Sequence, residues 1–306
     1  MRILLIYFTG TYNTRYITDI IKSRFVKKYQ ADVDTLEINS LTYHTTPNIG
    51  NYDIVGFGYP IYAFNTPKYF LKYLQKQILK EYVNKETIFF IYKNSGEVYH
   101  INDASSYSLV KMLEKKGIEI KNEYHFGMPY NIHFRFEDGI VKEMLLMNEK
   151  LADILVFEIV HKILNIKKYR VREKIISSVF KIQYIGGNIN SFFYHVNKKQ
   201  CDHCLMCVKT CPVNNIYVKK GKIKFHHHCI MCMRCSLNCH KNAFTIGFLN
   251  SWKVNGKYDF EKIRDHDFLK KYLKDDTKGF FKCYIPYNKV INKRYLELFG
   301  EDTIDD

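Results

Sequence analysis

The sequence predicts an α/β domain with a doubly wound parallel sheet, followed by a small α+β unit rich in cysteine. Between residues 1 and 164, short apolar runs alternate with helix-length segments, which is the pattern of a parallel sheet with helical crossovers. Polar loops rich in Thr, Gly and Asn follow three of these runs. Eight of the nine cysteines lie between Cys201 and Cys239, and such clustering indicates one local site instead of a disulfide framework.

The segment from Met1 to Leu164 contains five candidate strands and four candidate helices. The predicted strands are Ile3–Phe8, Val33–Ile38, Asp53–Gly58, Thr87–Tyr92 and Ile118–Phe126. The predicted helices are residues 14–29, 66–81, 103–116 and 139–164. Asp103 suits the start of the third helix and Gly117 its end, while Gly127 and Pro129 close the last strand. We therefore expect the first domain to end near Leu164.

The remaining chain divides into three segments by composition. Residues 165–196, rich in Lys, Ile and Phe, predict a helical connector, and residues 197–250 hold the clustered cysteines. Residues 251–306 form a C-terminal extension that ends in acidic residues and gives no sign of its role.

Charge and hydropathy exclude several classes of protein. The net charge is +16, but the lysines are spread along the whole chain without a dense basic block, so we do not expect nucleic-acid binding. The longest apolar candidate, Leu151–Val160, is interrupted by Asp153 and Glu158, which predicts no transmembrane segment. The apolar start is too short for a signal peptide, so a cytoplasmic protein is expected.

The cysteines form an internal repeat. The run C-x2-C-x2-C-x3-C occurs twice, at Cys201, Cys204, Cys207, Cys211 and again at Cys229, Cys232, Cys235, Cys239, with every cysteine shifted by the same offset. Pro212 follows the first run, and His240 follows the second. Between the runs, Ile216–Val218 and Ile223–Phe225 flank a Lys-Lys-Gly turn and predict a hairpin.

This run resembles that of bacterial ferredoxins with two 4Fe-4S clusters. The resemblance implies that the fourth cysteine of each run binds the other cluster. One cluster would then use Cys201, Cys204, Cys207 and Cys239, and the other Cys229, Cys232, Cys235 and Cys211. The alternative is zinc, which C-x2-C pairs also bind, but zinc gives no reason for the third cysteine or the proline.

Other residues near the cysteine runs predict a function less specifically. His240 occupies the position where the family usually has a second proline, and we hypothesise that it makes a cluster potential depend on pH; a solvent-facing histidine is the alternative. The three histidines before Cys229 are expected to serve the loop instead of a metal. Cys283 is expected to be an unpaired, partly buried thiol.

Three loops at the carboxyl ends of predicted strands resemble the cofactor loops of flavodoxins. Hydroxyl-rich residues at a helix start favour an anion, and the resemblance implies that an FMN phosphate binds Thr9, Gly10, Thr11, Asn13 and Thr14. It further implies that Tyr59, Tyr62, Ser95, Gly96 and Tyr99 line the site of the flavin ring. Tyr12 departs from this pattern, since flavodoxins generally have glycine at that position and a side chain there could crowd the phosphate.

The whole pattern resembles the EFR-family ferredoxins of anaerobes, over residues 1–164 and 197–246. That resemblance implies an electron carrier in which two clusters and FMN relay electrons between donor and acceptor proteins. No catalytic acid, base or nucleophile stands out. Two alternatives remain: an iron–sulfur flavoprotein that reduces a small acceptor such as a quinone, and a ferredoxin whose flavodoxin-like half serves only for docking.

Overall fold

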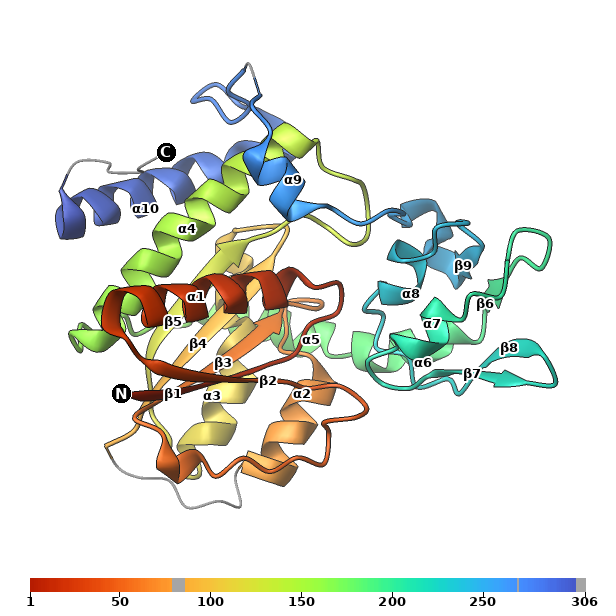
Figure 1. Ribbon diagram of the computed structural model, residues 1–306, viewed down its shortest axis with the longest axis horizontal. Helices are drawn as coiled ribbons and strands as arrows, with labels where there is room; N and C mark the ends of the chain where they lie inside the picture. Colours follow the sequence, from red (N-terminus) through yellow and green to blue (C-terminus); the bar gives the residue numbers. More distant parts are fainter. Residues whose placement is uncertain (79–85, 269, 301–306) are drawn as a thin grey trace.

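A computed structural model describes residues 1–78, 86–268 and 270–300, and Figure 1 shows its layers. The first unit is built on a five-stranded parallel sheet of order β2-β1-β3-β4-β5. Its strands are β1 (Arg2–Tyr7), β2 (Asp32–Glu37), β3 (Ile54–Pro60), β4 (Ile88–Ser95) and β5 (Ile120–Gly127). This order is that of the flavodoxin-like fold, so the predicted fold class is confirmed.

Helices cover both faces of the sheet. One face packs against α1 (Asn13–Tyr29) and α4 (Asp138–Val160), and the other against α2 (Lys68–Tyr73) and α3 (Tyr107–Glu114). Each face therefore has its own apolar core, which explains why the central strands read as nearly continuous apolar runs.

The predicted strands are confirmed, and the helices differ at their ends. The helix predicted for 66–81 is α2 followed by π-helical Leu74–Ile78, and its last residues lie outside the described part of the chain. The segment predicted to start at Asp103 begins as a 3-10 stretch, His100–Ser106, before α3. Asp103 therefore does not cap α3, and its carboxylate instead bonds His100 Nδ1 at 3.1 Å.

The segment after α4 contains α5 (Val171–Phe180) and α6 (Gln183–Ser191). It leads into the cysteine-rich module, which contains two antiparallel pairs. The first joins β6 (Tyr194–Val196) to β9 (Phe244–Ile246), and the second is the hairpin of β7 (Ile216–Lys219) and β8 (Lys222–Phe225). Two short helices, α7 (Met206–Lys209) and α8 (Arg234–Leu237), complete an arrangement compatible with a ferredoxin-like domain.

The C-terminal extension returns to the first unit (Figure 1). After a 3-10 stretch, Gly247–Trp252, the chain forms α9 (Phe260–Asp265), a second 3-10 stretch, Gly279–Cys283, and α10 (Tyr284–Phe299). Both α9 and α10 pack on α4 and belong to the core of the sheet unit. The extension thus completes one face of the flavodoxin-like unit. Among the described residues, no helix is both long and apolar enough to cross a bilayer.

Candidate functional site

The structure gathers the eight clustered cysteines around two cavities. The inner cavity is lined by Cys211, Cys229, Cys232 and Cys235. The outer cavity is lined by Cys201, Cys204, Cys207 and Cys239. Each cavity thus takes three cysteines from one run and the fourth from the other run. Cys235 also borders the outer cavity, so the two cavities are neighbours.

The cysteine repeat is also a repeat of backbone conformation. His203 and Leu205 in the first run have φ of 58° and 58°, and Met231 and Met233 in the second have φ of 54° and 61°. Side chains other than glycine adopt this left-handed region at a cost of about 1–2 kcal/mol each. The same left-handed turns recur at equivalent positions of the two runs. Both loops therefore adopt a costly backbone conformation, and in this conformation each loop wraps around its cavity.

Several of these cysteines lie in a low-dielectric environment. Burial raises the pKa of the Cys207 and Cys229 thiols to about 11, and that of Cys232 to about 12. Backbone amides point at three sulfurs: Asn215 N donates to Cys211 Sγ at 3.2 Å, Ala243 N to Cys239 Sγ at 3.3 Å, and Met231 N to Cys229 Sγ at 3.4 Å. Buried thiols remain protonated unless a cation binds them, and the N–H donors favour the thiolate form that metals require.

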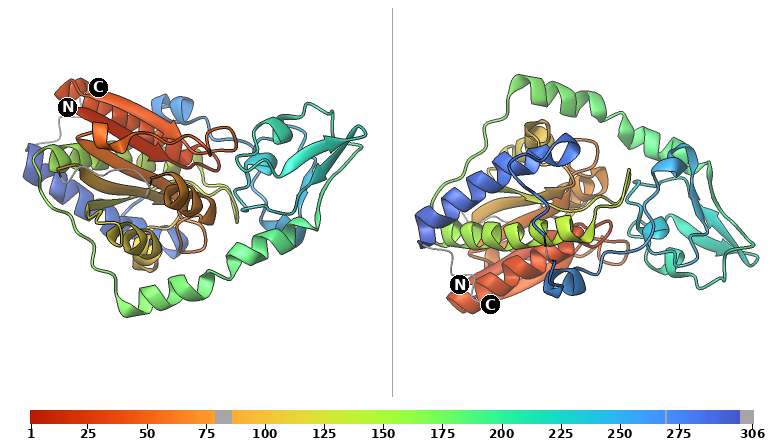
Figure 2. Two further views of the ribbon diagram at one scale, coloured as in Figure 1. Left: turned by 90° about the horizontal axis from the view of Figure 1, so that it is seen from below. Right: turned by 90° about the horizontal axis from the view of Figure 1, so that it is seen from above.

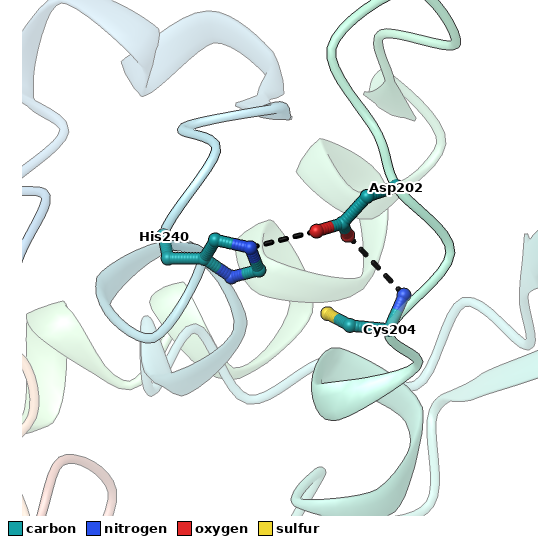
Figure 3. Close-up of side chains that lie close together, drawn as sticks. All are labelled: Asp202, Cys204 and His240. Carbon is teal, nitrogen blue, oxygen red and sulfur yellow. Dashed lines mark hydrogen bonds and ion pairs between the residues drawn. The ribbon is translucent and has the colours of Figure 1, made fainter.

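The mouth of the outer cavity is exposed and carries a hydrogen bond between a histidine and a carboxylate (Figure 3). His240 Nε2 lies 2.7 Å from Asp202 Oδ2, and Asp202 Oδ1 accepts a hydrogen bond from the Cys204 backbone at 3.3 Å. The ligand atoms of these three residues lie within 4.8 Å of one another. His240 is thus solvent-facing and tied to the loop of the outer cavity. Its effect on a potential remains a hypothesis.

The inner cavity abuts the loop between β1 and α1. The Arg234 guanidinium, only 5% exposed, donates to the backbone carbonyls of Thr9 and Gly10. Its third bond goes to Thr210 O at 3.1 Å, inside the module. A Cβ on Gly10 would lie 3.0 Å from Cys232 Cβ. The module therefore rests directly on the predicted phosphate loop.

Tyr12 is part of this contact. It has φ of 72°, the left-handed conformation that glycine adopts most easily, so the fold of the loop is kept without glycine. Its ring carries the cations of Arg15, Arg234 and Lys257 at 4.8–5.3 Å from the centroid. Its hydroxyl accepts a bond from Asn238 of the module at 3.4 Å. The side chain thus serves the junction between the two units.

The loop retains features that suit an anion. Thr9, Thr11 and Thr14 are buried, and the Thr9 hydroxyl has no hydrogen-bond partner in the described structure. The backbone N–H groups in the first turn of α1 have no intrahelical acceptor. The Thr14 hydroxyl accepts a bond from Asn94 Nδ2 at 2.8 Å, and Asn13 Nδ2 donates to Pro129 O at 2.9 Å. Hydrogen bonds therefore hold the side chains of Asn13 and Thr14 in place, and the Thr9 hydroxyl is free to bind an anion.

The residues predicted to line the flavin ring have different environments. Tyr62 is close to Gly10, and its hydroxyl is buried without a partner in the described structure. Tyr99 is 41% exposed. Ser95 Oγ donates to Glu97 O and bonds His125 Nε2 at 2.8 Å, and the ring of Tyr130 covers Gly96.

Tyr59 faces the core. Its side chain is fully buried and its hydroxyl donates to Ser106 Oγ at 2.7 Å. Ser106 donates in turn to Glu123, which is ion-paired with the fully buried Lys93 at 2.6 Å. The ring of Tyr59 thus belongs to a buried polar network at the ends of β4 and β5, and both of its faces are enclosed by protein.

Sequence reasoning missed Arg234, Asn131 and Asn238, which join the two units. Asn131 Nδ2 donates to Cys232 O at 3.2 Å. A signal for Arg234 was present in the repeat, because the equivalent residue of the first run is Met206. Met206 is 44% exposed beside the outer cavity, whereas Arg234 is buried beside the inner one. The second cysteine run therefore differs from the first by a buried cation, and it is the second run that contacts the loop between β1 and α1.

Comparison with known proteins finds fold neighbours only. No family model matches the chain, and no curated protein matches it. Flavodoxin 1 of Bacillus cereus is 13% identical, with 48% of this chain and 95% of that chain aligned and a TM-score of 0.36. A Streptococcus pneumonia flavodoxin is 16% identical (53% and 100% aligned, TM-score 0.38), and an FMN-bound Fusobacterium nucleatum flavodoxin is 17% identical (53% and 98%, TM-score 0.38). The fold assignment rests on the strand order itself.

Proposed function

We propose that this protein is an electron-transfer protein that carries two 4Fe-4S clusters on eight cysteines and relays electrons between partner proteins and an FMN. The observation that carries the proposal is the grouping of the cysteines into two adjacent sets of four. All-thiolate sets suit iron–sulfur clusters, which supply one-electron chemistry. The grouping within each set is the crossed ligation that the resemblance to bacterial ferredoxins implies.

The contact between the two units suggests the order in which electrons would pass through the cofactors. The inner set lies against the phosphate loop through Cys232 and Arg234. The outer set opens to solvent, where Cys204 is exposed. A partner protein would therefore exchange electrons with the outer cluster, and the inner cluster would exchange them with a cofactor in the flavodoxin-like unit.

The loop between β1 and α1 supports FMN as that cofactor. The unpaired Thr9 hydroxyl and the helix N-terminus at Asn13 suit a phosphate. Tyr62 and Tyr99 are the aromatic rings available beside the flavin position, and we leave Tyr59 out of the proposed site. FMN would supply exchange between one- and two-electron carriers.

A second candidate function is favoured by the position of the Tyr130 ring over Gly96. Because the Tyr130 ring occupies the space next to this loop, the flavodoxin-like unit could act as a docking module that binds no flavin. The clusters and their order are the same in both candidates, so flavin content distinguishes the two.

The deciding experiment is anaerobic purification followed by iron, sulfide, zinc and flavin quantitation on one sample. We expect about eight irons, eight sulfides and one FMN per chain. The same iron without flavin would favour the docking module, and zinc in place of iron would refute the cluster proposal.

A pair of cysteine variants tests the crossed ligation. Cys211→Ala should perturb the electron paramagnetic resonance signal of the cluster that Cys229, Cys232 and Cys235 hold, because Cys211 lines their cavity. Cys283→Ala is the matched control, since this buried thiol lies in the 3-10 stretch before α10. A change of iron content in the control would argue that the ninth cysteine is a ligand.

A further inference from the structure

The connector helices lie on the outside of the molecule and bridge its two units. Figure 2 shows α5 and α6 following one another along one flank, from the flavodoxin-like unit to the cysteine-rich module. Hydrogen bonds such as Gly186 N to Ile182 O continue helical geometry across the short break. The two helices therefore present one elongated surface.

In this pair of helices, polar residues face the protein and apolar residues face solvent, which is the reverse of an ordinary surface helix. The buried positions of the pair are polar or small: Glu173, Ser177, Gly187, Asn190 and Ser191. They are held by specific bonds, such as Ser177 Oγ to Asn65 Oδ1 at 2.8 Å and Asn190 Nδ2 to Ile246 O at 3.0 Å. Polar contacts thus fix the inward face, whereas surface helices normally turn their apolar face inward.

The outward face is apolar over its whole length. Six residues at spacings of three or four form what we call the connector stripe: Val171, Ile175, Val179, Ile182, Ile185 and Ile189. Each is between 54% and 72% exposed. The stripe extends for about 27 Å at 1.5 Å per residue. Phe192 and Phe193 continue it and are 63% and 49% exposed. Contiguous apolar surface of this kind marks an interaction site.

The charge around the stripe is strongly positive. The segment 165–193 contains six Lys or Arg and one acidic residue, Glu173. Lys168 and Arg172 are exposed and form no ion pair with any described acid. These cations, in a chain of net charge +16, disfavour pairing with a second copy of the same stripe. They complement an anionic surface.

We propose that the connector stripe docks the protein on an anionic lipid surface. An elongated helical ridge on the outside of the molecule, with aliphatic residues outward and Lys and Arg beside them, fits a planar bilayer. Its apolar face would enter the boundary between headgroups and acyl chains, and its cations would remain among the headgroups. Phe192 and Phe193 at one end add apolar side chains of the kind that interfacial helices insert. The protein is thereby a peripheral membrane protein.

Co-sedimentation with vesicles tests the proposal on the full chain, purified anaerobically. One set of vesicles contains phosphatidylcholine alone, and the other contains two parts of phosphatidylcholine to one part of phosphatidylglycerol. We expect binding to the anionic vesicles at least about tenfold tighter than to the neutral ones, weakening as salt is raised. Ile175→Ser/Ile182→Ser/Ile189→Ser should reduce this binding by at least about tenfold, because the apolar contribution is lost.

Matched variants separate the stripe from general apolarity and charge. Leu41→Ser/Val290→Ser/Leu296→Ser removes three exposed apolar residues elsewhere and should leave binding unchanged. Lys168→Glu/Arg172→Glu should weaken binding more than Lys27→Glu/Lys293→Glu, which has the same change of net charge. No binding to anionic vesicles, or equal binding by the stripe variant, would overturn the proposal. Concentration-dependent self-association that the stripe variant abolishes would assign the stripe to a second copy instead.

Discussion

At the scale of single residues, two buried groups determine how the ends of β4 and β5 are built. Lys93 is fully buried, and its Nζ donates to Asn102 O, Asp103 O and Ser106 Oγ at 2.8–3.1 Å. Its ion pair with Glu123 is closed by a bond from Tyr169 of the connector region at 2.6 Å. A buried charge is tolerated only when such a network compensates it.

Lys93→Met should therefore destabilise the protein by about 3–5 kcal/mol, because Glu123 is left as an uncompensated buried charge. The matched variant is Lys121→Met, whose ion pair with Glu119 is exposed and whose loss should cost less than about 1 kcal/mol. Urea unfolding of the two variants measures both values. Similar losses in the two would show that Glu123 finds another partner.

His125 lies beside this network, and it ties stability to pH. Burial, with Lys93 and Lys167 nearby, holds its pKa well below the usual 6.5. The folded state thus keeps a neutral imidazole, while the unfolded chain takes up a proton below about pH 6.5. Stability should fall as pH decreases from about 6.5, in a range where carboxylates are still ionised.

Melting temperatures at pH 7.5, 6.5 and 5.5 check this prediction. His125→Gln, which keeps a group able to bond Ser95, should show a smaller decrease between pH 6.5 and 5.5 than the unmodified chain. Parallel decreases in the two proteins would assign the pH dependence to other groups.

At the scale of elements, the sequence predicted where strands and helices form, but not which elements pack against one another. The five strands follow from short apolar runs, and the hairpin at residues 216–225 follows from two β-branched runs that flank a turn signal. The loop at residues 9–14 was predicted to bind a phosphate because its hydroxyls stand between a strand and a helix, and this remains a prediction. The docking of Arg234 on that loop was not predicted, because hydrophobic patterns specify which face of an element is buried and not what lies against it.

The phosphate loop itself can be tested by one added methyl group. Gly10→Ala places a Cβ against the Tyr62 hydroxyl, which must shift, and 3.0 Å from Cys232 Cβ, so the module must give by a few tenths of an ångström. We expect faster proteolysis at the junction and slower reduction of the flavodoxin-like unit. Gly186→Ala is the matched control: its Cβ meets nothing within 4 Å, and a helical alanine should add about 0.5–1 kcal/mol of stability. Unchanged proteolysis in Gly10→Ala would mean that the contact is loose.

At the scale of the whole molecule, the two units have unequal cores. The sheet unit has an extensive apolar core on each face, whereas the core of the cysteine-rich module is formed by five buried side chains: Tyr194, Ile216, Met233, Phe244 and Ile246. A unit of this size gains only about 3–5 kcal/mol from its core, so bound metal is expected to supply much of its stability.

If the module holds the proposed clusters, their removal by a chelator should therefore unfold the module alone. Hydrogen exchange followed by mass spectrometry should show lost protection for residues 194–246 and unchanged protection for β1, β3 and β4. Loss of protection in both units together would show that they unfold cooperatively. Retained protection in the module would show that its protein core suffices.

The return of the C-terminal extension was invisible in the sequence. Residues 251–306 gave no sign of their role, yet Tyr284 is buried and donates to Gly96 O at 2.9 Å, and Tyr287 donates to His125 O at 2.7 Å. These contacts join segments that lie far apart along the chain. Local periodicity contains no information about such pairing, and the same limit hid the inverted connector, whose outward apolar face reads in the sequence as an ordinary core face.

The return also means that the chain crosses between the two units twice, once through the connector and once after β9. A single proteolytic cut in either crossing would leave the module attached to the flavodoxin-like unit. Two tethers also restrict how far the module can swing, and they keep the inner cysteines at a high effective concentration beside the phosphate loop. If the units exchange electrons as proposed, the exchange should therefore be a first-order process whose rate is unchanged when the protein is diluted.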